Sequence, residues 1–308
     1  MFPVAASSLH LGEFLPPAVA MAAYAVPYAA RCRTLRRERK PVARWRQVSF
    51  AAGVVLIVGV LIPPADKLAD QLLVAHMVQH LLLGDIAALL IALGLTGPLL
   101  QPLLRHRPNR ALRWLSNPVA AFVLWAVDLY AWHAPGLYQA ALRHDLVHSL
   151  QHACFFLFGL NMWLALLGPF PKPAWFGNLG RLGYILAVRF AGAVLGNILI
   201  WSGSVFYPYY ASGEASHGVT ALHDQGLAGA AMMLEQSILT VGLFAWLFMR
   251  AAAEGERRQE LIEFAAEHHV ELSPERAARA VAAGRDAELR ERLTRERRVD
   301  RGAHIVPP

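Results

Sequence analysis

Seven apolar stretches dominate this sequence, and each is long enough, or nearly so, to cross a lipid bilayer. A helix that crosses about 30 Å of hydrocarbon needs roughly 20 consecutive apolar residues. The bilayer core offers no water to backbone polar groups, so such stretches fold as helices. The sequence therefore predicts an all-α fold, a seven-helix transmembrane bundle. The predicted spans are residues 11–30, 48–63, 72–95, 118–134, 146–167, 182–203 and 226–249.

The composition divides the chain into a membrane part and a polar part. Only 17% of the residues are charged and the mean hydropathy is +0.36, whereas ordinary soluble domains are about 25% charged. Residues 251–308 differ, because they hold 11 Lys/Arg and 12 Asp/Glu. We expect a seven-span membrane domain over residues 1–250 and a short, charged, helical cytoplasmic tail over residues 251–308. In that tail, Ser273 with Pro274 predicts a helix start and Gly284 predicts a helix end.

The loops predict the direction of the chain across the membrane. Eight Lys/Arg follow the first span within residues 31–46, and the loops after the third and fifth spans are also basic, whereas the intervening loops carry only Lys67 and Arg143. Positive charge collects in cytoplasmic loops. We therefore expect a periplasmic N-terminus and a cytoplasmic C-terminus in a multi-pass protein. Topology thus accounts for the net charge of +7, and we expect the lipid bilayer, and no nucleic acid, as a partner.

Two matched pairs of histidines open the third and fifth spans. The third begins with HMVQH, which contains His76 and His80, and the fifth begins with HSLQH, which contains His148 and His152. Residues four apart share one face of a helix, and these two spans run in the same direction. If the two spans are neighbours, the four imidazoles converge just below the outer face. His133 ends the fourth span at the same side.

An imidazole cluster of this kind suits copper or zinc, and one axial nitrogen from each of two helices suits a haem. Met77 lies inside the first pair, and Met232 and Met233 lie about two turns into the last span. Thioether ligands favour Cu(I). Asp224, at the start of the last span, is a candidate ligand or a partner for a ligand imidazole, whereas Cys154 faces away from the pair in its own helix.

Asp85, Asp128, Arg189 and Glu235 fall within predicted spans, where an unpaired charge costs at least about 2.5–3.5 kcal/mol. The predicted depths of Asp85, Arg189 and Glu235 overlap, so we expect Arg189 to pair with one of the two carboxylates. The three residues would form either a structural ion pair or a proton or ion relay. Asp128 precedes His133 by five residues and is a candidate acceptor for a ligand imidazole.

Three segments together resemble the CtaG family of cytochrome c oxidase assembly factors, in its caa(3)-associated, polytopic branch. They are HMVQH, the stretch from Trp132 to Tyr138 followed by the second histidine pair, and DQGLAG from Asp224 to Gly229. The resemblance covers about residues 10–250. The sequence departs from the family pattern at Gln151, where an acidic residue is expected, and at Met233-Leu234, where a Met-Trp pair is common.

The resemblance implies a bacterial inner-membrane protein that helps to mature cytochrome c oxidase, with delivery of copper, as Cu(I) or Cu(II), as its usual proposed role. The implied partners are the membrane subunit of the oxidase and periplasmic copper carriers, and no enzymatic activity is expected. Two alternatives stay open, a haem-binding electron-transfer protein and a metal or proton transporter. The candidate metal ligands are His76, His80, His133, His148, His152, Asp224 and Met77.

Overall fold

The computed structural model describes residues 11–105, 114, 117–170, 172–173 and 175–303, and each regular element within them is a helix. The prediction of an all-α protein is therefore confirmed. The chain divides into two compact units, unit 1 (Met1–Thr240) and unit 2 (Val241–Pro308). The longer helices of unit 1 are α1 (Leu11–Arg37), α2 (Arg44–Val60), α8 (Pro118–His133), α10 (Asp145–Leu167), α11 (Asn178–Trp201) and the first part of α13 (Ala221–Glu267).

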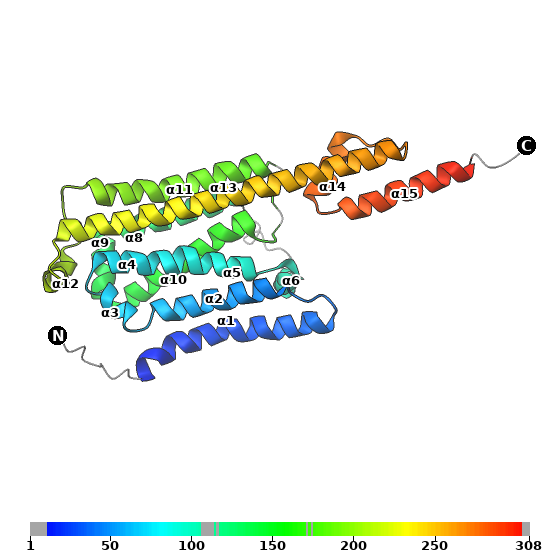
Figure 1. The fold of residues 1–308 in the computed structure, drawn as a ribbon. Coiled ribbons are helices and arrows are strands. Elements are labelled where there is room, and N and C mark those ends of the chain that lie inside the picture. The colour runs from blue at the N-terminus through cyan, green and yellow to red at the C-terminus, as the bar shows by residue number, and fades with distance from the viewer. Residues whose placement is uncertain (1–10, 106–113, 115–116, 171, 174, 304–308) are drawn as a thin grey trace, which may run out of the picture. The chain divides into compact units, whose positions relative to one another are not determined.

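The third predicted span is one helical rod made of three elements, α4 (Leu73–Leu81), the π-helix η1 (Leu82–Ala87) and α5 (Ala88–Gly94). Figure 1 shows this rod beside α2 and α10, and both helices contact it. Short helices connect the rods: α3 (Ala65–Ala69), α6 (Gly97–Arg105), α9 (Pro135–Arg143), the 3₁₀ turn η2 (Pro208–Tyr210) and α12 (Ala211–Ser216).

Helices occupy all seven predicted spans, but only four in the described part of the chain are both long and apolar enough to cross a membrane. These four are Leu73–Gly94, Asp145–Leu167, Asn178–Trp201 and Ala221–Glu267. The helices α2 and α8 have 17 and 16 residues, which is short of the roughly 20 residues that a bilayer requires. The membrane character is supported, whereas the number of spans and the direction of the termini stay predictions.

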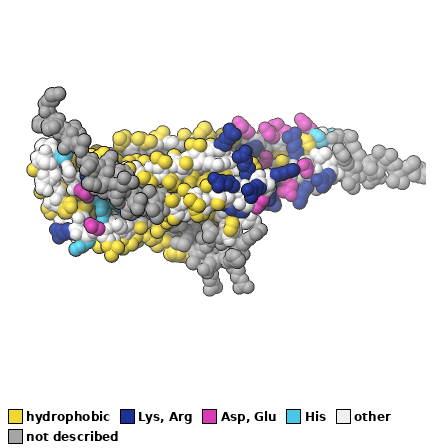
Figure 2. All heavy atoms as spheres, turned by 90° about the horizontal axis from the view of Figure 1, so that it is seen from below, with side chains coloured by type: hydrophobic (Ala, Val, Ile, Leu, Met, Phe, Trp, Pro, Cys, Tyr) yellow, Lys and Arg dark blue, Asp and Glu magenta, His cyan; other side chains and the backbone are white. Residues whose placement is uncertain are grey.

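The surface of unit 1 is largely hydrophobic, as expected of helices that face lipid. Figure 2 shows hydrophobic side chains over much of the visible face. Exposed fractions reach 62% for Val127, 72% for Phe190 and 62% for Ile238, which lie on α8, α11 and α13. Soluble monomers rarely expose apolar side chains on this scale.

A close approach of two backbones sets the spacing between η1 and α10. A Cβ atom built on Gly159 of α10 would collide with the carbonyl oxygen of Gly84 in η1. On the other side of unit 1, Gly229 of α13 approaches Gly196 of α11, and a Cβ atom on Gly229 would lie 2.5 Å from the Gly196 carbonyl oxygen. Glycine at these positions lets helices pack closely in a membrane.

Unit 2 contains the end of α13, α14 (Pro274–Ala282) and α15 (Asp286–Ala303). The side chain of Ser273 accepts a hydrogen bond from the backbone N–H of Arg276, so it is the N-cap that the sequence predicts. Gly284 follows the C-cap residue of α14, Ala283, and has a φ of +66°, a conformation that glycine adopts without strain. Both predicted boundaries are confirmed. The unit has its own apolar cluster, which includes Leu261, Val281 and Leu293.

Candidate metal centre

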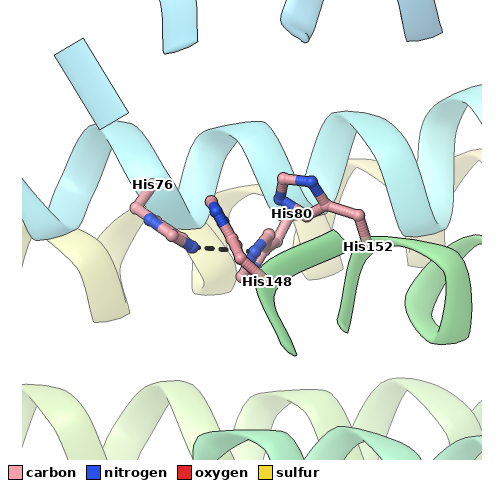
Figure 3. Close-up of side chains that lie close together, drawn as sticks. All are labelled: His76, His80, His148 and His152. Carbon is pink, nitrogen blue, oxygen red and sulfur yellow. Dashed lines mark hydrogen bonds between the residues drawn. The ribbon is translucent and has the colours of Figure 1, made fainter. Parts of the chain in front are cut away.

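Four imidazoles from two helices meet inside unit 1, as Figure 3 shows. His76 and His80 belong to α4, and His148 and His152 belong to α10; one nitrogen from each ring lies within 4.8 Å of the other three. The side chains of His76 and His80 are buried, and those of His148 and His152 are half-buried. The predicted convergence of the two pairs is therefore present. Such a group of nitrogens can hold a single metal ion.

The contacts inside this cluster leave ring nitrogens available for a ligand. The Nε2 atoms of His76 and His80 lie 2.8 Å apart, with one of them as the donor. The Nδ1 atom of His80 and the Nε2 atoms of His148 and His152 are buried and have no hydrogen-bond partner among the described residues. Because a buried polar atom without a partner costs free energy, a bound ion would stabilise this arrangement.

Asp224 of α13 fixes the start of the helix that carries the first pair. Its Oδ2 atom accepts a hydrogen bond from the backbone N–H of Leu73 at 2.6 Å, and its Oδ1 atom accepts one from Val74 at 3.0 Å. These are the first two N–H groups of α4, which have no partner within the helix. The carboxylate is fully buried. The structure thus places Asp224 at a helix terminus, outside the group of four imidazoles.

Three acidic side chains lie near His148 of the cluster. Asp66, Asp70 and Asp145 all lie close enough to His148 to interact with it electrostatically. Burial, and then the neighbouring charge of Asp66, raise the pKa of Asp70. Asp66 also accepts a hydrogen bond from Gln79, on the α4 turn between the two histidines. Negative charge near a site raises the local concentration of cations.

His133 lies near the cluster but is separate from it. Its Nδ1–H donates to the backbone carbonyl of Leu129 at 2.7 Å, and its buried Nε2 has no partner among the described residues. The prediction that Asp128 orients this ring is wrong, because a backbone carbonyl one turn earlier takes that role. Asp128 instead interacts with Trp132 of the same helix.

The intramembrane charges form a three-residue network. Arg189 of α11 lies 2.9 Å from Asp85 of η1 and 3.4 Å from Glu235 of α13. The predicted pairing is confirmed, and the guanidinium contacts both carboxylates. Its partners come from two other helices, so the network ties three helices together. With every group ionised, the network has a formal charge of −1.

Three buried tyrosines, Tyr138, Tyr207 and Tyr210, lie near the histidines, and the sequence did not predict this arrangement. The ring of Tyr138 lies 5.4 Å from that of His76 and 6.2 Å from that of His133. Its hydroxyl group hydrogen bonds that of Tyr210, and the hydroxyl of Tyr207 donates to the backbone carbonyl of His133. Tyr138 ends the stretch from Trp132 that carries part of the family resemblance, but nothing in the sequence marked its side chain as a neighbour of the histidines.

The fold and the site together define a class of protein, a helical membrane protein with a buried imidazole cluster between two of its helices. Residues 26–254 match the family of cytochrome c oxidase caa3 assembly factors, Caa3_CtaG. The chain belongs to this family, so the resemblance seen in the sequence is confirmed.

Three similar curated proteins come from mycobacteria, and each is named as an uncharacterized protein. Those of Mycobacterium bovis and Mycobacterium tuberculosis are 25% identical over 224 residues, and that of Mycobacterium leprae is 24% identical over 224 residues. Each alignment covers 67% of this chain and 34% of the relative. The chain thus spans about a third of the length of the relatives it matches. No solved structure matches the chain.

Proposed function

We propose that this protein aids maturation of cytochrome c oxidase by binding copper through His76, His80, His148 and His152 and passing it to the oxidase. The observation that carries the proposal is the convergence of four imidazole nitrogens within 4.8 Å of one another. It gains weight from the family, whose description is assembly of a cytochrome c oxidase. The protein binds and transfers an ion in this proposal, and no catalytic turnover is required.

The small volume of the adjacent cavity and the imidazole donor atoms favour copper over a haem as the bound group. The cavity next to the cluster has a volume of about 50 Å³, whereas pockets for ligands of drug size begin at about 300 Å³. A porphyrin has no room in this cavity, whereas a bare ion does. Imidazole is a good ligand for copper in both oxidation states. The nitrogen ligands are neutral and exchange readily, which suits an ion that must be released again.

The same proposal includes the topology that the loops predict. The chain would cross a bacterial inner membrane seven times, with α1, α2 and α8 as the remaining spans, a periplasmic N-terminus and a cytoplasmic C-terminus. The cluster then lies near the periplasmic face, where periplasmic copper carriers can reach it. From that depth the ion can pass laterally to the membrane subunit of the oxidase. We further propose His133 and Met77 as ligands that act later along this route.

The test is the copper content of the purified, full-length protein after copper loading. We expect the wild type to hold copper in the cluster and a variant with His76→Ala, His80→Ala, His148→Ala and His152→Ala to lose that ion, and so to hold less copper than the wild type. A matched control carries His144→Ala and His217→Ala, which remove two exposed histidines outside the cluster. The control should bind as much copper as the wild type.

A second measurement connects binding to oxidase maturation. Cells that lack this protein should contain oxidase deficient in copper, and the wild-type gene but not the four-histidine variant should restore oxidase activity. Equal copper in the wild type and in the four-histidine variant would refute the metal assignment. A Soret absorption band in protein purified from haem-replete cells would favour the haem-binding alternative instead.

A further inference from the structure

We propose a second metal position, which takes Cu(I) and lies in a small cavity between α4, α8, α10 and α13, beyond the four-histidine cluster. Its ligands are the Nε2 atom of His133 and the thioethers of Met77 and Met232. This inference rests on the proposed function, because it assumes that copper enters through the cluster. It adds a separate site of different chemistry, with sulfur donors that the outer cluster lacks.

The cavity begins where the cluster ends. Its volume is about 50 Å³, and His80, Met77, His133 and Met232 line it. His80 is the cluster residue farther along α4, one turn after His76, and the cavity continues into η1, where Asp85 lines it. The rings of His80 and His133 both pack against Phe155, at centroid distances of 4.7 and 5.8 Å. An ion that leaves the cluster past His80 therefore reaches this cavity.

The donors in the cavity match a soft monovalent ion. The hydrogen bond to Leu129 fixes the proton of His133 on Nδ1, so its Nε2 atom carries a lone pair. That atom is buried and has no partner among the described residues. Met77 and Met232, which are 1% and 2% exposed, belong to one packed cluster. One imidazole nitrogen and two thioethers form a three-donor set that favours Cu(I) over harder ions.

A carboxylate lies beside the proposed site, where it would attract a cation. Asp85 lines the cavity, and its Oδ1 atom is buried without a hydrogen-bond partner in the described chain. Arg189 is the only basic group in the network and pairs with both Asp85 and Glu235.

His80 connects the two positions. One of its nitrogens contacts His76, and its ring also lines the inner cavity. A neutral imidazole offers one lone pair at a time, so His80 serves one ion at a time. Exchange of this ligand moves Cu(I) from nitrogen donors at the outer cluster to nitrogen and sulfur donors at the inner site, with no change of oxidation state.

The experiment is an anaerobic Cu(I) titration of the full-length protein in detergent, with bicinchoninate as the competing chelator and X-ray absorption of the loaded protein. We expect two Cu(I) ions per chain and copper–sulfur scattering. The double variant Met77→Leu, Met232→Leu should bind one ion and lose the sulfur signal. Leucine replaces methionine with little change in volume, so this variant keeps its fold. The control Met162→Leu changes a buried methionine that does not line the cavity, and should retain both ions.

The outcomes separate this inference from the proposed function. A wild type that binds one ion with nitrogen scattering alone would overturn the inner site, and so would unchanged copper and sulfur scattering in the Met77→Leu, Met232→Leu variant. The double variant His148→Ala, His152→Ala should lose the outer ion and keep the sulfur signal. Full binding of two ions by this variant would refute the outer cluster, and with it the proposed function, while the inner site would stand.

Discussion

At the scale of single residues, the Asp224 carboxylate joins the start of α4 to α13 and thereby sets the position of His76 and His80. Asp224→Ala would leave two backbone donors, Leu73 and Val74, buried without their acceptors. We expect a loss of roughly 1–3 kcal/mol in the free energy of unfolding, measured by thermal unfolding in detergent. Asp224→Asn retains one acceptor oxygen and should lose less.

The asparagine variant also distinguishes a capping residue from a metal ligand. Because the structure places Asp224 outside the imidazole group, Asp224→Asn should bind as many copper ions at saturation as the wild type. Wild-type stability combined with lost copper in this variant would instead identify the carboxylate as a ligand.

A second residue-scale prediction concerns the contact between η1 and α10. Gly159→Ala places a methyl group against the Gly84 carbonyl oxygen and must push the two helices apart. Overpacking of this kind costs typically 1–3 kcal/mol, and the displacement should also weaken copper binding, since α10 carries His148 and His152. Gly183→Ala is the control, because a Cβ atom there meets nothing within 4 Å. Equal melting temperatures for both variants would contradict this packing argument.

At the scale of elements, the ion-pair network holds η1, α11 and α13 together. Arg189→Met leaves Asp85 and Glu235 buried without their cation, and removal of one partner from a buried pair typically costs 3–5 kcal/mol. The triple variant Asp85→Asn, Arg189→Met, Glu235→Gln removes all three charges and should recover most of that loss. Thermal unfolding of the two variants measures the difference, and equal destabilisation in both would argue against a structural ion pair.

The sequence predicted best those features that the spacing of residues along a single helix determines. Histidines four residues apart must share a helix face, so the two pairs could be identified before their partner helix was known. The depth of charged residues along each span likewise predicted that Arg189 meets a carboxylate. No such periodicity marks the π-helix η1 or the approach of Gly84 to Gly159, because both depend on how two helices fit together. The same holds for Asp224, whose partners at Leu73 and Val74 are distant in the sequence.

At the scale of the whole molecule, the direction of insertion decides whether the cluster meets periplasmic copper. His217 follows α12 on the side where α4 and α10 begin, and Glu271 lies in the polar unit 2; both side chains are exposed. In a background with Cys32→Ser and Cys154→Ser, we introduce either His217→Cys or Glu271→Cys. A membrane-impermeant maleimide should label the first in intact spheroplasts and the second only after permeabilisation, because basic loops stay in the cytoplasm. The reverse pattern would place the four histidines at the cytoplasmic face, where a periplasmic copper carrier has no access to them.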